Sequence, residues 1–251
     1  MSLRHNFELS YILAKIGFVL RNEGTWLGIF WYLLAPFLTF LLLFAIFFDR
    51  LGHQIPNYAV YLFLGIILFN FFQKITGESI AIIRSNSGII KSMNFSRESL
   101  VGAVVLKTLF SHFFEVLLLC LFLIYFKISL IGLIFYPLIL LFFLIFSFGI
   151  SLVLSSLSIY FVDLGNVWEF ASKLIWFGTP VFYSIGGQTT LIYLNLFNPM
   201  YYFITITREV LIYNTLPELW MMGVALFYSL FYLLIGLFMF NKLKIKFAEL
   251  I

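Results

Sequence analysis

Long hydrophobic runs separated by short polar stretches set the pattern of this chain. Six such runs occupy residues 29–48, 58–83, 100–126, 128–162, 170–186 and 219–240. A helix needs about 20 mostly apolar residues to cross a bilayer, and only the run at 170–186, which contains Pro180, falls short of that length. The run at 128–162 is longer than one crossing requires, so its excess is expected to tilt or to project from the bilayer. The pattern predicts an all-α polytopic membrane protein with six transmembrane helices.

The N-terminal residues 1–25 show a different pattern, with one narrow polar stripe on a mostly apolar helix. The stripe consists of Arg4, Glu8, Tyr11, Lys15 and Asn22, whose spacings of 4, 3, 4 and 7 bring them to one helix face. Amphipathic helices without a full-length apolar run lie in the membrane interface. The sequence therefore predicts an N-terminal interface helix.

The segment 185–217 is too apolar for a solvated loop and too interrupted for a membrane span. It has Arg208 and Glu209 as its two charges, and Pro199 disfavours helix at Asn198. We predict two short helices that dip into the membrane and return, with Asn198 and Pro199 at the bend. The alternative is a pair of helices that rest on the outer surface.

Composition and charge place the chain in lipid and orient it. Hydrophobic residues make up 63% of the chain and charged residues only 10%, against about 25% charged in soluble domains. With the N-terminus inside, cytoplasmic segments would contain nine basic residues and external segments three, which favours both termini in the cytoplasm. The nine are Arg4, Lys15, Arg21, Arg84, Lys91, Arg97, Lys242, Lys244 and Lys246, and the three are Arg50, Lys127 and Arg208.

The cytoplasmic connection at 84–99 combines apolar and basic side chains. Ile89, Ile90 and Met93 stand among Lys91 and Arg97. A solvated loop has little reason to present such apolar groups, whereas a short amphipathic helix that docks on a partner or on the membrane does. The alternative is a plain interfacial connector.

Four charged residues fall inside the predicted spans. Lys74 and Glu78 are four residues apart and can pair on one helix face, and Lys107 and Glu115 occur in the next span. Charges within the bilayer must face protein or a watery cavity. They could form a polar pathway or a structural pair between helices, and Lys107, near a span end, could instead extend toward the interface.

The sequence has no recognisable catalytic or nucleotide-binding motif. It has no G-x-x-x-x-G-K-[ST] phosphate loop, no H-E-x-x-H motif and no Ser/His/Asp arrangement, and its one cysteine, Cys120, leaves no intrachain disulfide. His5, His53 and His112 are scattered, so we interpret each as a packing or interface residue rather than a metal ligand. We expect a transporter subunit without enzymatic activity. An ion-coupled transporter using Lys74, Glu78 and Glu115, or a membrane-embedded glycolipid enzyme, remains an alternative.

Short motifs along most of the chain resemble one family in their order and spacing. They are Arg21, Leu27-Gly28, Trp31 and Pro36; Asn86, Ile89-Ile90-Lys91 and Phe95-Ser96-Arg97-Glu98; Phe161-Val162-Asp163; the stretch "TPVFYS" at 179–184; Asn198-Pro199; and "REVL" at 208–211. In these features the chain resembles ABC-2-type permease subunits that export polysaccharides such as O-antigen, teichoic acid or capsule. Ser96 replaces the usual proline of that pattern, and Val162 replaces its arginine.

The resemblance implies a homodimer with two copies of a separate ATPase subunit, which would bind ATP and magnesium, so we expect no cofactor in this chain. It implies a lipid-linked polysaccharide substrate and a place in the bacterial cytoplasmic membrane among lipids, with no nucleic-acid partner; export of a drug or peptide is the near alternative. The implied coupling residues are Arg84, Asn86, Ile89, Ile90, Lys91, Met93, Arg97, Glu98 and Asp163. The implied external gate residues are Asn198, Pro199, Tyr201 and Tyr202.

Overall fold

The computed structural model describes residues 3–22, 28, 30–92, 95–186 and 188–250, and these contain helices and no strands. The longer helices are α1 (Leu3–Asn22), α2 (Phe30–Phe47), α3 (Tyr58–Ser85), α5 (Glu98–Tyr125), α6 (Tyr136–Leu157), α7 (Leu164–Gly178), α9 (Pro199–Leu211) and α10 (Leu219–Leu243). The shorter ones are η1 (Phe48–Gly52), α4 (Ser87–Ser92), η2 (Leu130–Ile134), α8 (Thr189–Leu196), η3 (Lys244–Lys246) and α11 (Phe247–Leu250).

Within the described residues, five helical segments are long and apolar enough to cross a membrane: Phe30–Gly52, Tyr58–Ser85, Glu98–Tyr125, Tyr136–Leu157 and Leu219–Lys246. The predicted fifth span at 170–186 differs from the structure. Its helix, α7, begins at Leu164 and ends at Gly178, which makes it 15 residues long, or about 22 Å. Thr179 leaves the helix with φ −88° and ψ 138°, because the following Pro180 disfavours helical backbone at the residue before it. Six full-length spans are therefore not found.

The long uncharged run at 128–162 also divides into separate elements. Lys127 ends the preceding helix with a positive φ of 55°, and the short helix η2 follows. Pro137 then stands in the first turn of α6, where its missing N–H breaks no hydrogen bond. The residues of this run that exceed one membrane span therefore form a 3₁₀ helix before α6 and a turn after it.

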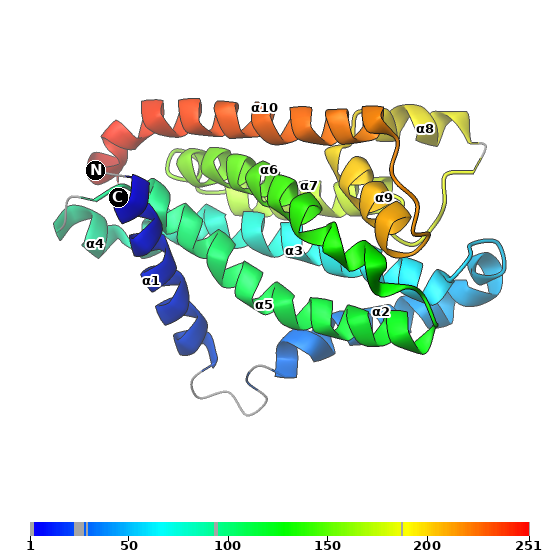
Figure 1. Cartoon of the computed structure of the whole chain (residues 1–251). Coiled ribbons are helices and arrows are strands. Elements are labelled where there is room, and N and C mark those ends of the chain that lie inside the picture. The colour runs from blue at the N-terminus through cyan, green and yellow to red at the C-terminus, as the bar shows by residue number, and fades with distance from the viewer. Residues whose placement is uncertain (1–2, 23–27, 29, 93–94, 187, 251) are drawn as a thin grey trace.

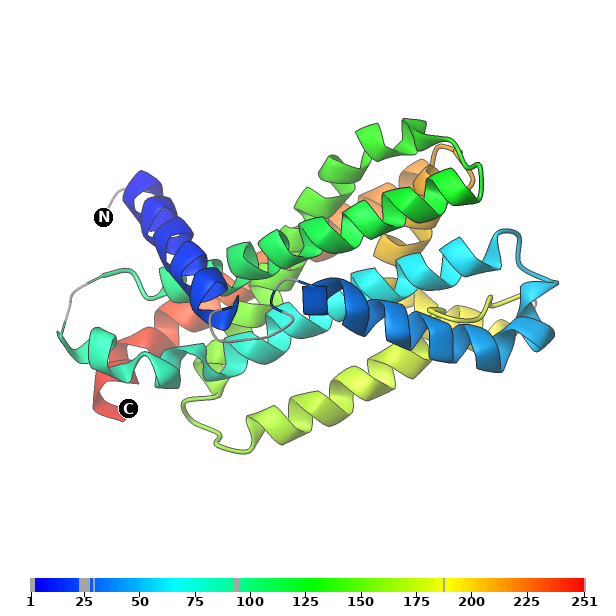
Figure 2. The ribbon, with the colours of Figure 1, turned by 90° about the horizontal axis from the view of Figure 1, so that it is seen from below.

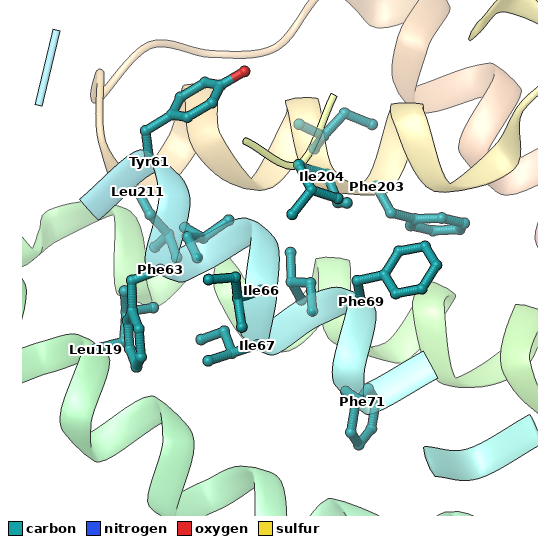
Figure 3. Packing of buried hydrophobic residues seen from close by; sticks show 14 of the residues in the cluster. Tyr61, Phe63, Ile66, Ile67, Phe69, Phe71, Leu119, Phe203, Ile204 and Leu211 are labelled. Carbon is teal, nitrogen blue, oxygen red and sulfur yellow. The ribbon is translucent and has the colours of Figure 1, made fainter. Parts of the chain in front are cut away.

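α3 is the central helix of the bundle. It packs against α2, α5, α6, α7 and α9, and these surround it in two perpendicular views (Figures 1 and 2). Its sequence is hydrophobic on all sides in its first half, as expected of a helix enclosed by protein. Figure 3 shows Phe203 and Ile204 of α9 on one side of α3 and Leu119 of α5 on the other. Phe63, Phe69, Phe71 and Phe72 are among the largest fully buried side chains.

α6 and α10 pack through two glycines. A Cβ atom on Gly236 of α10 would lie 2.3 Å from the carbonyl oxygen of Gly149 in α6, and one on Gly149 would lie 2.4 Å from the backbone of Tyr232. Ser229 also donates a hydrogen bond of 2.9 Å to the carbonyl of Phe142 across the same seam. Small residues of this kind let backbones approach closely in membrane helix pairs.

The two ends of the bundle carry different elements (Figure 1). Both termini and α4 lie at one end, whereas α8 and the connection from α2 to α3 lie at the other. α1 packs on α5, with Ser10 and Ala14 buried against it and Glu8 and Lys15 exposed. A location of α1 at the membrane interface stays a prediction. The predicted helix residues 23–25 lie outside the described part of the chain.

Candidate functional site

A segment without helical structure, residues 179–185, follows α7; its first three residues are buried, and Arg208 contacts it. This arginine, on α9, is 3% exposed. Its guanidinium donates to the carbonyls of Pro180 (2.6 Å), Val181 (2.7 Å) and Tyr61 (3.1 Å), and its central carbon lies 3.3 Å from the centroid of the Tyr61 ring. Buried backbone carbonyls need partners, and here one charged side chain supplies three.

Two tyrosines of α3 bind the next carbonyls of the same segment. Tyr58 donates to the Phe182 carbonyl at 2.9 Å, and Tyr61 donates to the Tyr183 carbonyl at 2.8 Å. Gly65, one turn further along α3, provides the space for this arrangement, since a Cβ there would lie 2.6 Å from Arg208 Nη2. Side chains from two helices thus replace the hydrogen bonds that the backbone of residues 180–183 would make in a helix.

The predicted bend at Asn198 and Pro199 is present. α8 ends at Leu196 and α9 begins at Pro199, with Asn198 as its N-cap. The Asn198 side-chain oxygen accepts a hydrogen bond of 3.1 Å from the Met200 N–H, as N-cap residues do. Its side-chain nitrogen donates to Thr179 Oγ1 at 2.8 Å. The bend is therefore attached to the segment that follows α7.

The neighbouring Tyr201 and Tyr202 have different surroundings. Tyr202 is 2% exposed, donates to the Leu196 carbonyl at 2.9 Å, and meets the Trp220 ring edge to face. It thus packs α8 against α9, and its place in an external gate stays a prediction. Tyr201 is only partly buried and lines a cavity of about 460 Å³.

The charges inside α3 and α5 pair between the helices. Lys74 Nζ lies 2.7 Å from Glu115 Oε1, and Lys107 Nζ lies 2.6 Å from Glu78 Oε2. The alternative of a structural pair between helices therefore describes the arrangement, with Lys74 and Glu78 each paired to α5. α3 and α5 lie side by side, so each lysine reaches the carboxylate of the facing helix.

His112 extends this contact into a polar chain. Its Nδ1 lies 2.8 Å from Glu115 Oε2, and its Nε2 lies 2.6 Å from the hydroxyl of Tyr136 at the start of α6. A neutral imidazole with its proton on Nδ1 satisfies every contact, because it donates to Glu115 and accepts from Tyr136. The interpretation of His112 as a packing or interface residue did not identify this polar chain, which links α5 to α6.

The segment 84–99 contains the short helix α4, and its two isoleucines face different surroundings. Ile90 is 5% exposed and belongs to a buried cluster with Ile83, Leu100 and Phe247. Ile89 is 39% exposed. Ile90 therefore stabilises this chain, and Ile89 is the isoleucine that a partner can contact. Met93 lies outside the described residues.

The charged members of the predicted coupling set mostly hold helix ends together. Arg84 of α3 donates to the Ile159 carbonyl after α6 at 3.1 Å. Arg97 donates to the carbonyl of Lys244, and Lys244 Nζ in turn lies 2.5 Å from Glu98 Oε1.

Other members of this set differ in their surroundings. Asn86 donates to the Ile82 carbonyl at 2.8 Å, which ends α3. Lys91 and Asp163 are exposed.

Sequence reasoning missed the roles of Arg208 and His112. Arg208 counts in the charge pattern as one of three external basic residues, yet it is buried. An arginine within the apolar run of α9 was an available signal, because a charge in such a run must find polar partners in protein. Among the described residues, no group of three His, Cys, Asp or Glu side chains could hold a metal ion.

Comparisons with known proteins match along most of the chain. The family model described as ABC-2 type transporter matches residues 9–212. Two O-antigen export system permease proteins RfbA from Klebsiella pneumoniae are each 28% identical to this chain, and each alignment covers 100% of the chain and 97% of the relative. The O-antigen export system permease protein RfbA from Myxococcus xanthus is 24% identical over 79% of the chain and 78% of the relative.

Proposed function

This chain belongs to the ABC-2 type transporter family, and we propose that it is the membrane subunit of an ATP-driven exporter of lipid-linked polysaccharide. The observation that carries the proposal is the end-to-end similarity to two O-antigen export permeases, which leaves no large part of the chain unmatched. The substrate would be a glycan on a lipid anchor, moved from the inner leaflet of the cytoplasmic membrane to its outer side.

ATP hydrolysis would occur on a separate subunit. The sequence has no phosphate loop, so this chain would contribute the membrane path and respond to motion of the partner. We propose two copies of this chain with two copies of the ATPase subunit. The end of the bundle with both termini and α4 would face the cytoplasm and the ATPase, as the distribution of basic residues favours.

The opposite end would form the external gate. α8 and α9 are joined at Asn198, and hydrogen bonds attach this joint and Arg208 to the segment after α7. A movement of α7 would therefore be passed directly to both short helices. We propose that they enter the outer part of the membrane from outside and return, closing the path between export steps.

Deleting the gene for this chain in its host is expected to remove the surface polysaccharide, and the gene on a plasmid is expected to restore it. The purified complex of this chain with its ATPase subunit should hydrolyse ATP, and the purified chain alone should not. Periodate staining of the extracted glycan measures the surface polysaccharide, and phosphate release measures ATP hydrolysis. Transport by the chain alone, driven by a proton gradient, would contradict the proposal and favour the ion-coupled alternative.

Ile89→Asp is expected to weaken binding of the ATPase subunit on the order of tenfold, since a carboxylate replaces an apolar contact at the interface. The chain itself should fold normally because Ile89 is exposed. Co-purification with the ATPase subunit and the thermal unfolding temperature are the measurements.

Two variants serve as controls. Ile131→Asp changes an exposed isoleucine between α5 and α6, at the opposite end, and should leave the complex intact. Ile90→Asp should instead lower the unfolding temperature of the chain, because Ile90 is in its core. Normal complex formation by the Ile89 variant would show that α4 does not contact the ATPase.

The paired charges in α3 and α5 support the exporter over an ion-coupled transporter. Lys74, Glu115, His112 and Tyr136 contact one another at 2.6–2.8 Å, so they stabilise the bundle without any ion from solution. The surface-glycan assay distinguishes polysaccharide export from the alternative, export of a drug or peptide by a member of the same family.

A further inference from the structure

A second feature of the gate end is the cavity of about 460 Å³ that Tyr201 lines. It lies between the start of α3, the segment after α7, α9 and the turn that follows α9. Its wall includes Tyr61, Tyr201, Tyr213, Glu209, Thr205 and Ser184. Its volume falls within the range of about 300–1,000 Å³ found for small-molecule sites.

Aromatic and hydroxyl groups dominate this wall. The Tyr213 side chain is 39% exposed and Tyr201 is partly buried, so both rings border open space. The pKa of the Tyr213 hydroxyl is raised, mainly by burial and to a smaller extent by the nearby Tyr61. At neutral pH that hydroxyl is therefore protonated and can donate a hydrogen bond.

The charged groups at this cavity are not fully satisfied. Within the described part of the chain, Glu209 Oε2 and Arg208 Nε are buried without a hydrogen-bond partner. Buried polar atoms of this kind are costly unless a ligand or water completes them. The lining thus combines the Glu209 carboxylate with several hydroxyls and tyrosine rings.

We propose that this cavity binds a sugar unit of the exported glycan as it reaches the outer end, a proposal that rests on the export function proposed above. A sugar ring presents C–H faces, which pack on aromatic rings, and hydroxyls, which pair with Glu209, Thr205 and Ser184. The hydroxyls of the wall then have partners, and each accessible ring has an apolar surface to cover.

Other ligand classes fit this cavity less well. A metal ion prefers several oxygen ligands, whereas the lining residues here include a single carboxylate, Glu209, together with the cation Arg208. A lipid chain suits a second cavity of about 480 Å³, whose lining includes Phe72, Phe146 and Trp168 and which is mainly apolar.

The test uses photo-cross-linking in the intact exporter, in living host cells. Tyr213→p-benzoylphenylalanine places a photoreactive ring at the cavity, and Leu216→p-benzoylphenylalanine places it three residues further on. Leu216 is 82% exposed and does not line the cavity. After illumination, the purified chain is stained for carbohydrate by periodate oxidation. We expect a glycan conjugate at position 213 and none at 216. No conjugate at 213, or equal conjugates at both, with export intact, would overturn the proposal.

Two substitutions test the same site by function. Glu209→Gln and Tyr213→Ala are each expected to slow export on the order of tenfold, since loss of one well-packed contact removes about 1.4 kcal/mol. Leu216→Ala should export normally. Normal export by both site variants, in a host where gene deletion removes the surface glycan, overturns the sugar site and leaves the export function standing. A deletion that leaves the surface glycan unchanged overturns the export function itself.

Discussion

Gly236→Leu is expected to leave little folded protein in the membrane. A Cβ at this position would lie 2.3 Å from the Gly149 carbonyl oxygen and 3.1 Å from the Gly149 Cα. These are backbone atoms, so no rotamer change relieves the clash, and α10 must move away from α6. Overpacking in a well-packed core costs about 1–3 kcal/mol and sometimes more, and here the whole seam separates. The measurements are the yield of monodisperse protein and its thermal unfolding temperature.

The matched control for this change is Gly223→Leu on the same helix. Nothing lies within 4 Å of a Cβ at Gly223, so the leucine should be accommodated and should favour helix. Gly149→Leu is expected to fail in the same way as Gly236→Leu, because its Cβ would meet the backbone of α10. Equal yields and unfolding temperatures for the Gly236 and Gly223 variants would contradict the close contact of α6 and α10.

Arg208→Met is expected to be the most damaging single change at the end of the bundle that carries α8. It would leave the carbonyls of Pro180, Val181 and Tyr61 without their donor in a buried place. Hydrogen bonds to charged groups contribute about 1.5–3 kcal/mol each, partly offset because a buried charge is also removed. We expect a net loss of about 3 kcal/mol, seen as a lower unfolding temperature, together with loss of export.

Arg208→Lys separates charge from geometry. Lysine keeps the positive charge but lacks the planar fork that bonds two carbonyls while lying over the Tyr61 ring, so we expect only partial recovery of stability and export. Arg50→Met, at an exposed arginine of η1 at the same end, is the control and should be neutral. If Arg208→Met unfolds at the same temperature as Arg50→Met, Arg208 does not hold the segment after α7.

The long helices could be predicted because each is defined by local sequence. The run at 58–83 corresponds to α3, Tyr58–Ser85, and the run at 219–240 to α10, Leu219–Leu243. The bend at Asn198 and Pro199 was predictable for the same reason, since both its causes are local: a capping side chain and a proline in the first turn.

The remaining features depend on contacts between distant parts of the chain. Ile89 and Ile90 are neighbours in sequence, and only the position of α11 and α5 makes one a core residue. Nothing in the sequence indicates that Arg208 contacts Pro180 and Tyr61. The end of α7 at Gly178, by contrast, has a local cause, since Pro180 disfavours helix at the residue before it. The apolar composition beyond Pro180 nevertheless suggested a longer span.

The two ion pairs between α3 and α5 have a consequence for insertion of the chain into the membrane. α3 precedes α5 in the chain, so it can enter the bilayer before Glu115 and Lys107 lie beside it. During that interval Lys74 and Glu78, four residues apart, can neutralise each other on their own helix, which lowers the cost of inserting two charges. Arrival of α5 then replaces one temporary pair with two permanent ones. The same two charges of α3 can thus pair on their own helix before α5 arrives, and each pairs with α5 in the folded structure.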